Sequence, residues 1–289
     1  MEKAELRKIV GRIESLPTLP TVLSKVTELV QNPKTSAANL GDVISEDPAL
    51  TARVLKLVNS AFYSLPQRVS TVTRAVSIIG FNALKNLVLA SSIFDLFPDQ
   101  ANGGLFDREK FWHHSIGCAI GAKATAKFIR YPEIEEMFVA GLLHDIGKVI
   151  EDQFLHEEFA GLIALAEEKN TLLVEAEKEV LNYTHADLGR LLTERWKLPI
   201  QLVESIAFHH EPGLSARFKR EAAVIHLADI LCRAKNIGSG GDNEIPPLDR
   251  GSWEVLELKL SAIEPMMEEI EEEYENLALI LAPPAQGDN

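Results

Sequence analysis

The chain has 289 residues and 46% of them are hydrophobic, so it can bury a large core in one domain or in two packed lobes. Its formal net charge of −14 argues against nucleic acid or an anionic membrane surface as a general partner. The sequence shows no apolar run as long as a membrane span and no signal-peptide pattern, and its two cysteines do not suggest a disulfide framework. We therefore expect a cytoplasmic protein.

The first hundred residues predict short helices joined by tight turns. Asp47 followed by Pro48 is typical of a helix start, because the carboxylate can cap the helix and proline has no N–H to leave unpaired. We predict a helix from Pro48 to about Asn59. Its apolar stripe consists of Leu50, Val54, Leu57 and Val58.

Two more helices are expected before residue 100. Ser70 or Thr71 can cap the first of them and Gly80 can end it, and Asn82 can cap the second, which runs toward Ile93. The sequence shows no sustained alternation of apolar and polar residues, and its β-branched residues stand at helical spacing. The fold class predicted for the whole chain is therefore all-α.

Histidines and carboxylates in the middle of the chain predict a metal site. All eight histidines lie between positions 113 and 226, and only His156 falls outside the pattern. The strongest signal is the adjacent pair His144-Asp145, which we expect a rigid, apolar helix to deliver as neighbouring nitrogen and oxygen ligands. The other candidates are expected to arrive from separate helices. The candidate metal ligands are His113 or His114, His144, Asp145, His185, His209, His210 and Asp229.

The last of these ligands comes from a mostly apolar segment. His226 and Asp229 are three residues apart and should share one helix face. A buried aspartate needs a partner or a metal, so Asp229 is interpreted as a ligand and His226 as a core residue or a neighbour that orients the ligands. Cys118 and Cys232 lie one helical turn from His114 and Asp229. Small core residues are the favoured interpretation of both cysteines, with thiol ligation or redox sensitivity as alternatives.

These residues resemble the HD superfamily of metal-dependent phosphohydrolases, whose ligands run as His, His-Asp and a later Asp. The segment 144–148 resembles the central motif of the HD-GYP branch, and the spacing in that branch favours His114 over His113 as the first ligand. The choice between these two histidines stays open. The chain departs from the branch because it has Pro212-Gly213-Leu214 and no Gly-Tyr-Pro signature.

Three segments of the first hundred residues resemble the HDOD family, the HD-related output domain of bacterial signalling proteins. The segments are 16–20, 46–60 and 75–80, and the resemblance extends from about residue 10 to 235. It implies an HD-like helical bundle preceded by a packed helical lobe. It also implies a signalling output that binds a protein partner or a small phosphate-containing ligand. Members often lack some metal ligands, whereas this chain keeps nearly the full set.

The retained ligands imply a binuclear site for divalent metal, with iron or manganese favoured and magnesium or zinc as alternatives. If the site is catalytic, the chain is a metal-dependent phosphohydrolase or phosphodiesterase acting on a nucleotide or cyclic dinucleotide. Asp145 would then bridge the metals and Lys148 would stabilise charge on the phosphoryl group. Lys148 can alternatively be interpreted as a cation at a helix C-terminus. The sequence leaves the oligomeric state open.

We divide the chain into an N-terminal helical lobe at 1–100, a metal-binding lobe at 101–240 and an acidic helical extension with a tail at 241–289. The extension repeats apolar residues at spacings of four and three, and Pro265 is expected to interrupt it. We expect this helix to pack on the protein's own core rather than in a dimer. The apolar repeat consists of Leu256, Leu260, Ile263, Met267, Ile270, Tyr274 and Leu277.

Overall fold

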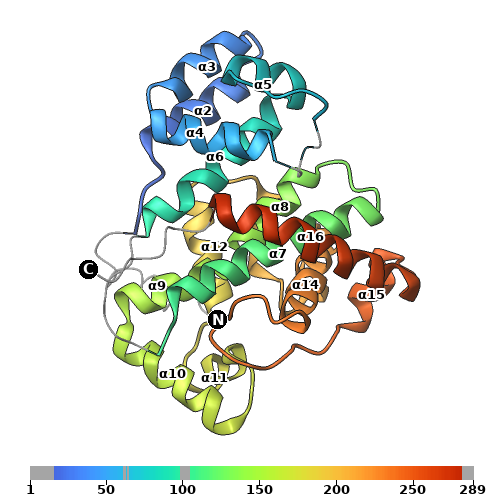
Figure 1. The fold of residues 1–289 in the computed structure, drawn as a ribbon. Coiled ribbons are helices and arrows are strands. Elements are labelled where there is room, and N and C mark those ends of the chain that lie inside the picture. Colours follow the sequence, from blue (N-terminus) through green and yellow to red (C-terminus); the bar gives the residue numbers. More distant parts are fainter. Residues whose placement is uncertain (1–15, 61–62, 64, 98–104, 282–289) are drawn as a thin grey trace. The chain divides into compact units, whose positions relative to one another are not determined.

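A computed structural model describes residues 16–60, 63, 65–97 and 105–281, and these residues form helices and loops without a strand (Figure 1). The predicted all-α fold class is confirmed. Within the described ranges, no helix has the length and apolar character that a membrane span requires. The chain divides into two compact units, one comprising Met1–Pro17 and Asp99–Ile270 and the other Thr18–Pro98 and Glu271–Asn289. The three-part division of the sequence stays a prediction.

The unit that contains Thr18–Pro98 is built from short helices. Asp47 caps one of them as predicted, because its carboxylate accepts hydrogen bonds from the backbone N–H groups of Ala49 and Leu50, each at 3.0 Å. Pro48 occupies the first helical position, and the predicted apolar stripe is buried. The helices within Thr18–Pro98 are α2 (Thr21–Gln31), α3 (Ala37–Ser45), α4 (Pro48–Val58), α5 (Val72–Ile79) and α6 (Phe81–Leu96).

The boundary between α5 and α6 corrects one expectation. Thr71 caps α5 by accepting a hydrogen bond from the N–H of Arg74 at 3.2 Å, and Gly80 ends it with a φ of 87°. Asn82 does not cap α6, because that helix already begins at Phe81 and Asn82 lies within its first turn. Gly80 adopts a backbone conformation that other residues rarely reach, and this lets the second helix start at once.

The other unit surrounds α7 (Arg108–Phe128), a helix buried on nearly all sides. Small residues let its neighbours approach closely: a Cβ on Gly121 would lie 3.3 Å from Cβ of Ala228, and one on Gly141 would lie 2.6 Å from the carbonyl oxygen of Cys118. The other helices here are α8 (Ile134–Leu143), α9 (Ile146–Phe154), α10 (His156–Lys169), α11 (Leu173–Val180), α12 (His185–Arg195), α13 (Ile200–Ala207), α14 (Lys219–Ala234) and α15 (Arg250–Leu256).

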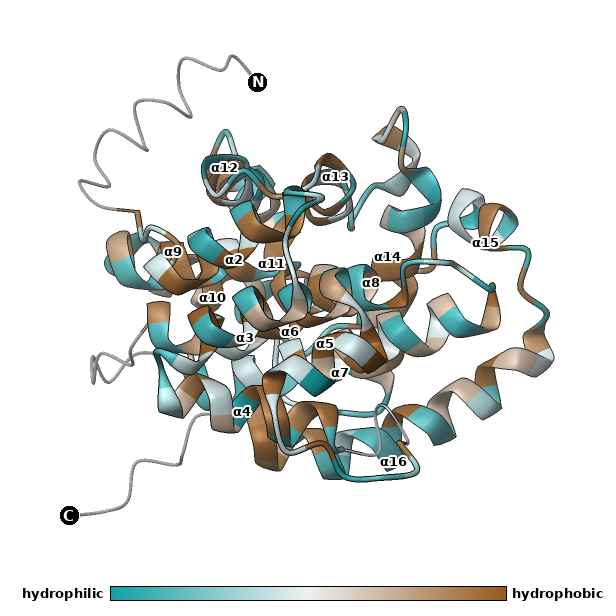
Figure 2. Ribbon diagram, turned by 90° about the horizontal axis from the view of Figure 1, so that it is seen from above, coloured by the Kyte–Doolittle hydropathy of each residue, from teal (hydrophilic) through white to brown (hydrophobic). Residues whose placement is uncertain are grey.

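The acidic C-terminal segment forms one helix, α16 (Ile263–Leu281), on which hydrophilic and hydrophobic residues are interspersed (Figure 2). Pro265 does not interrupt α16, because it lies in the first turn, where a proline costs no backbone hydrogen bond. The predicted apolar repeat is partly correct. Ile270 and Leu277 are buried, whereas Leu260 is 81% exposed and Met266 is buried in place of Met267. The predicted tail at the end of this extension lies outside the described residues.

Candidate metal centre

The His144-Asp145 pair lies at a break between two helices. His144 directly follows the last residue of α8, and Asp145 directly precedes the first residue of α9. The expectation that one continuous helix carries both residues is therefore corrected. Both side chains are buried at the break, since His144 is 0% exposed and Asp145 is 1% exposed.

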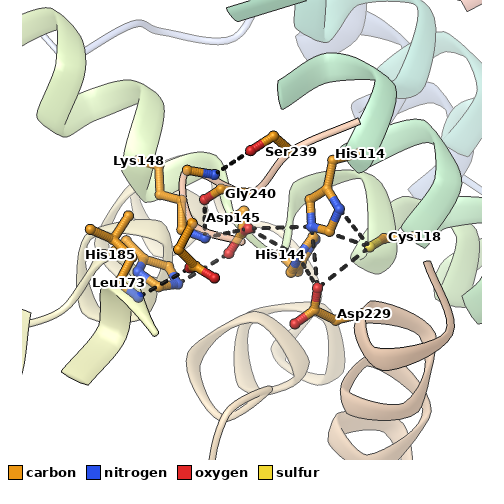
Figure 3. Close-up of polar contacts among 12 residues, drawn as sticks. His114, Cys118, His144, Asp145, Lys148, Leu173, His185, Asp229, Ser239 and Gly240 are labelled. Atoms are coloured by element: carbon orange, nitrogen blue, oxygen red, sulfur yellow. Dashed lines mark hydrogen bonds and ion pairs between the residues drawn. The ribbon is translucent and has the colours of Figure 1, made fainter. Parts of the chain in front are cut away.

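His144 belongs to a first group of side chains that could hold a metal ion. The group consists of His114, Cys118, His144 and Asp229, all buried, with one ligand atom from each lying within 4.8 Å of the others. Nε2 of His114 is 3.2 Å from Oδ1 of Asp229 and 3.5 Å from Sγ of Cys118 (Figure 3). His114 and Cys118 share one face of α7, and Asp229 comes from α14.

Asp145 belongs to a second group with His185, His209 and His210. Nε2 of His185 lies 3.1 Å from Oδ1 of Asp145, and Nε2 of His209 lies 3.5 Å from the same oxygen. Nε2 of His210 is 2.9 Å from Nε2 of His185. His185 is the first residue of α12, and the other two histidines follow the C-terminus of α13. His210 is the one member of this group that is partly exposed.

The carboxylate of Asp145 faces both groups at once. Its Oδ2 is 3.3 Å from Nε2 of His144 and 3.6 Å from Nε2 of His114, whereas its Oδ1 faces His185. The structure thus brings together all seven side chains that the sequence proposed as ligands. Their role as ligands stays a prediction.

Unpaired polar atoms test whether these residues fit a metal. Nε2 of His144, Oδ1 of Asp145 and Nε2 of His209 are buried and have no hydrogen-bond partner. Burying such atoms without a partner is costly, and a divalent cation between them would remove that cost. Imidazole, carboxylate and thiolate groups are all ligands of transition metals. The donor set therefore fits a pair of divalent metal ions.

Contacts at Nδ1 orient the imidazole rings of His144 and His209 so that Nε2 of each ring faces the candidate metal site. Nδ1 of His144 lies 2.7 Å from the carbonyl oxygen of Gly141, and Nδ1 of His209 lies 2.7 Å from that of Ile206. Both histidines can therefore donate through Nδ1 and leave Nε2 free to bind a metal. His226 contacts the backbone of His209, since its Nδ1 lies 2.9 Å from the carbonyl oxygen of His209. This placement fits the predicted orienting role of His226.

Glu177 holds His185 in the same way, and the sequence interpretation missed it. Its carboxylate oxygens lie 2.8 Å from Nδ1 of His185, and one also accepts the backbone N–H of His185 at 2.9 Å. Glu177 is 0% exposed. The only sequence signal was an acidic residue eight positions before a candidate ligand, which is a common occurrence in a chain with 43 acidic residues.

Two buried cations balance the two aspartates. Nζ of Lys148 is 2.6 Å from Oδ2 of Asp145 and donates to the carbonyl oxygen of Gly240 at 2.8 Å. Nε of Arg233 donates to Oδ1 of Asp229 at 2.8 Å. Lys148 lies in the first turn of α9, so its interpretation as a helix C-terminal cation is wrong.

These charges set the pKa values of the site without a metal. Burial alone would raise the pKa of Asp145, but His144, Lys148 and His185 hold it well below its usual range. Burial lowers the pKa of His209 to about 4. For His114 and His144, burial is outweighed by the neighbouring cysteine and aspartate side chains, which raise the two pKa values to about 10 and about 9.

Fold and site together define an all-α protein with two buried groups of side chains that could hold metal ions, and similarity to known proteins identifies its family. Residues 16–212 of the chain match the HDOD domain family. The chain belongs to the HDOD family.

One relative and two solved structures illustrate what the chain is similar to. A protein of Treponema pallidum (strain Nichols), described as uncharacterized, is 26% identical over 227 residues, which is 78% of this chain but only 44% of that relative. An HDOD domain protein of unknown function from Geobacter sulfurreducens is similar in structure, with a TM-score of 0.76, 25% identity and coverage of 96% of this chain and 94% of the other. A protein from Shewanella amazonensis SB2B, described as a "Putative phosphohydrolase", has a TM-score of 0.65 and 25% identity over 91% of this chain and 97% of its own.

Proposed function

We propose that this protein is a signalling output of the HDOD type whose buried site holds two divalent metal ions and which acts by binding a protein partner or a small phosphate-containing ligand. The observation that carries the metal site is the placement of Asp145. One of its oxygens faces His144 and the other faces His185, as expected of a carboxylate shared by two cations. Iron or manganese is favoured by the mixed nitrogen and oxygen donors, with magnesium or zinc as alternatives.

The protein side chains have distinct tasks in this proposal. Asp145 joins the two groups, Lys148 neutralises part of its charge, and Glu177 fixes the ring of His185. A bound metal pair would supply water activation and stabilisation of phosphoryl oxygens. Because Lys148 already contacts Asp145 and Gly240, its charge is available to a ligand only if that network rearranges. Its direct role toward phosphate stays a prediction.

Metal content tests the proposal, and two adjacent histidines supply a matched pair of variants. His114 is buried within the first group, whereas His113 is half-buried and belongs to neither group. We expect anaerobically purified wild-type protein to contain about two equivalents of iron or manganese by elemental analysis. The variant His114→Ala should lose the metal of the first group, and His113→Ala should retain both.

Two further results bear on the same test. The double variant His144→Ala/Asp145→Ala should lose both metals while circular dichroism shows preserved helix content, because the apolar faces of the helices build the core. A wild-type protein that takes up no stoichiometric metal under anaerobic conditions, even when iron or manganese is supplied, would contradict the proposed metal site.

Hydrolysis of a phosphodiester is a second candidate function, and the surroundings of His210 favour it. A pocket of about 400 Å³ is lined by this histidine together with Tyr183, Asp187 and Phe208. It offers a ligand access to the side of the second group that is not fully buried. The similarity to the Shewanella protein described as a "Putative phosphohydrolase" gives further support.

An assay distinguishes the two candidates. Metal-loaded protein would be incubated with a chromogenic phosphodiester, nucleotides and cyclic dinucleotides, with Asp145→Asn as the inactive control. Metal-dependent release of phosphate or a linear product in the wild type alone would support hydrolysis. Stoichiometric metal without turnover, together with metal-dependent binding of the same ligands, would support the signalling output.

A further inference from the structure

Cys118 lies among the proposed ligands of the first metal position rather than merely in the core beside them. We infer that the Cys118 side chain binds this metal as a thiolate, together with His114, His144 and Asp229. The inference rests on the proposed metal site and goes beyond it by giving the two metal positions different ligand chemistry.

The position of Cys118 is fixed by the packing of α7. It follows His114 by four residues, so the two side chains project from the same face of the helix. Its backbone meets α8 at Gly141, where any side chain would collide with the carbonyl oxygen of Cys118. The thiol is fully buried, so it can reach only the groups that surround it.

The distances around Cys118 match those between ligands of one metal ion. Metal–sulfur bonds of about 2.3 Å and metal–nitrogen bonds of about 2.0–2.1 Å at tetrahedral angles place sulfur and nitrogen about 3.6 Å apart. Sγ of Cys118 lies 3.5 Å from Nε2 of His114 and 4.0 Å from Oδ1 of Asp229. Nε2 of His114 and Oδ1 of Asp229 are 3.2 Å apart, close to the roughly 3.4 Å of nitrogen and oxygen ligands. With the Asp145 oxygen that faces this group, Cys118 would be one of five ligands at the first metal position, and a small adjustment of side chains would complete it.

Cys232 is equally buried but its surroundings differ. Its Sγ lies 3.5 Å from Nδ1 of His114, the nitrogen on the other side of that ring. The same sulfur lies 3.5 and 3.6 Å from the carbonyl oxygens of His114 and Ile237, and its single S–H can donate to either. Cys232 therefore contacts the other nitrogen of His114 and is not among the side chains grouped around the metal position. The chain thus provides a buried cysteine as an internal control.

Thiolate ligation has a defined chemical consequence. On metal binding the Cys118 S–H bond breaks, a metal–sulfur bond forms, and the proton passes to buffer; no oxidant or reductant takes part. A thiolate favours zinc, iron or cobalt over magnesium or manganese. The second group contains no sulfur, so the first position should discriminate against hard cations more strongly than the second.

Cobalt(II) gives a direct test, because a cobalt–thiolate bond produces an intense near-ultraviolet charge-transfer band that nitrogen and oxygen ligands do not. Metal-free full-length protein would be titrated with Co²⁺ under anaerobic conditions, and the visible and ultraviolet spectra recorded. We expect the wild type and Cys232→Ala to show the charge-transfer band. Cys118→Ser should lose the band while its visible cobalt bands remain, perturbed in position.

The outcomes separate the two proposals. Cobalt binding with visible bands but no charge-transfer band in the wild type would overturn thiolate ligation and leave the metal site standing. Absence of any cobalt binding would overturn both. If Cys118→Ser does not fold, X-ray absorption of zinc-loaded wild-type protein serves instead: a sulfur neighbour at about 2.3 Å in wild type and Cys232→Ala supports the inference, and a shell of nitrogen and oxygen alone overturns it.

Discussion

Glu177 lies 2.8 Å from Nδ1 of His185, and neither side chain is exposed to solvent. The carboxylate thereby turns Nε2 of His185 toward Asp145 and increases the basicity of that nitrogen. A residue that contacts no proposed metal position directly should therefore influence metal affinity at the second group.

The variant Glu177→Gln tests this influence. It should weaken metal binding at the second group about 10–100-fold, because a neutral amide holds the imidazole less strongly than a carboxylate does. Competition with a chromogenic chelator measures the affinity. Glu175→Gln is the matched control on the same helix, since Glu175 is exposed and pairs with Lys178. Equal affinities for the two variants would contradict the assigned role of Glu177.

Gly147 controls the approach of α9 to α12. A Cβ at this position would overlap the carbonyl oxygen of His185, so the backbones can approach this closely only with glycine. We expect Gly147→Ala to destabilise the protein by about 1–3 kcal/mol and to weaken metal binding at the second group. Chemical denaturation with and without metal measures both effects.

The control for Gly147→Ala is Gly161→Ala in α10. A Cβ added at Gly161 would meet no neighbouring atom within 4 Å. Alanine there should stabilise the helix by about 0.5–1 kcal/mol, since glycine costs backbone entropy in a helix interior. If both substitutions shifted stability in the same direction, the close contact between α9 and α12 would be refuted.

Metal affinity should depend on pH. Without metal, the pKa values of His114 and His144 are about 10 and about 9, so both imidazoles are protonated at neutral pH. Metal binding requires their neutral forms and therefore releases protons. Affinity should rise as pH increases from 7 toward 9. Calorimetry in buffers of different ionisation enthalpy measures the release, and an affinity that stays constant or falls over this range would argue against it.

The helical unit that contains Leu57 supplies a stability test independent of metal. Leu57 is 2% exposed on the buried face of α4, so Leu57→Ala should destabilise the protein by about 2–5 kcal/mol. The exposed neighbour Lys56 is the control, and Lys56→Ala should change stability by less than about 0.5 kcal/mol. A loss well under 1 kcal/mol for Leu57→Ala would show that this helix face is assigned incorrectly.

The sequence predicted local features best where one residue decides them. Asp47 and Pro48 specified the start of α4, and Gly80 specified the end of α5, because capping and φ preferences act over a few residues. Asn82 was misplaced because its side chain suits a cap equally well in isolation, whereas the turn at Gly80 had already started the helix.

The residue types in the sequence predicted the candidate ligands. They did not predict the residues that surround those ligands. The His144-Asp145 pair means little alone, but further histidines follow and precede it in the sequence, so the proposed ligands could be named before their distances were known. Glu177 and Arg233 could not be singled out, because acidic and basic residues are common and only burial distinguishes these two. The sequence also did not predict the helix break at His144-Asp145, because the apolar run around it continues without a proline.

The central claim is that Asp145 lies between two metal ions. Crystals grown anaerobically with Fe²⁺ would be measured at the iron absorption edge, and an anomalous difference map would locate the ions. We expect two peaks about 3.5–4 Å apart, one beside His114 and Asp229 and the other beside His185 and His209, with one oxygen of Asp145 bound to each. A single peak, or no peak at full metal saturation in solution, would contradict this account.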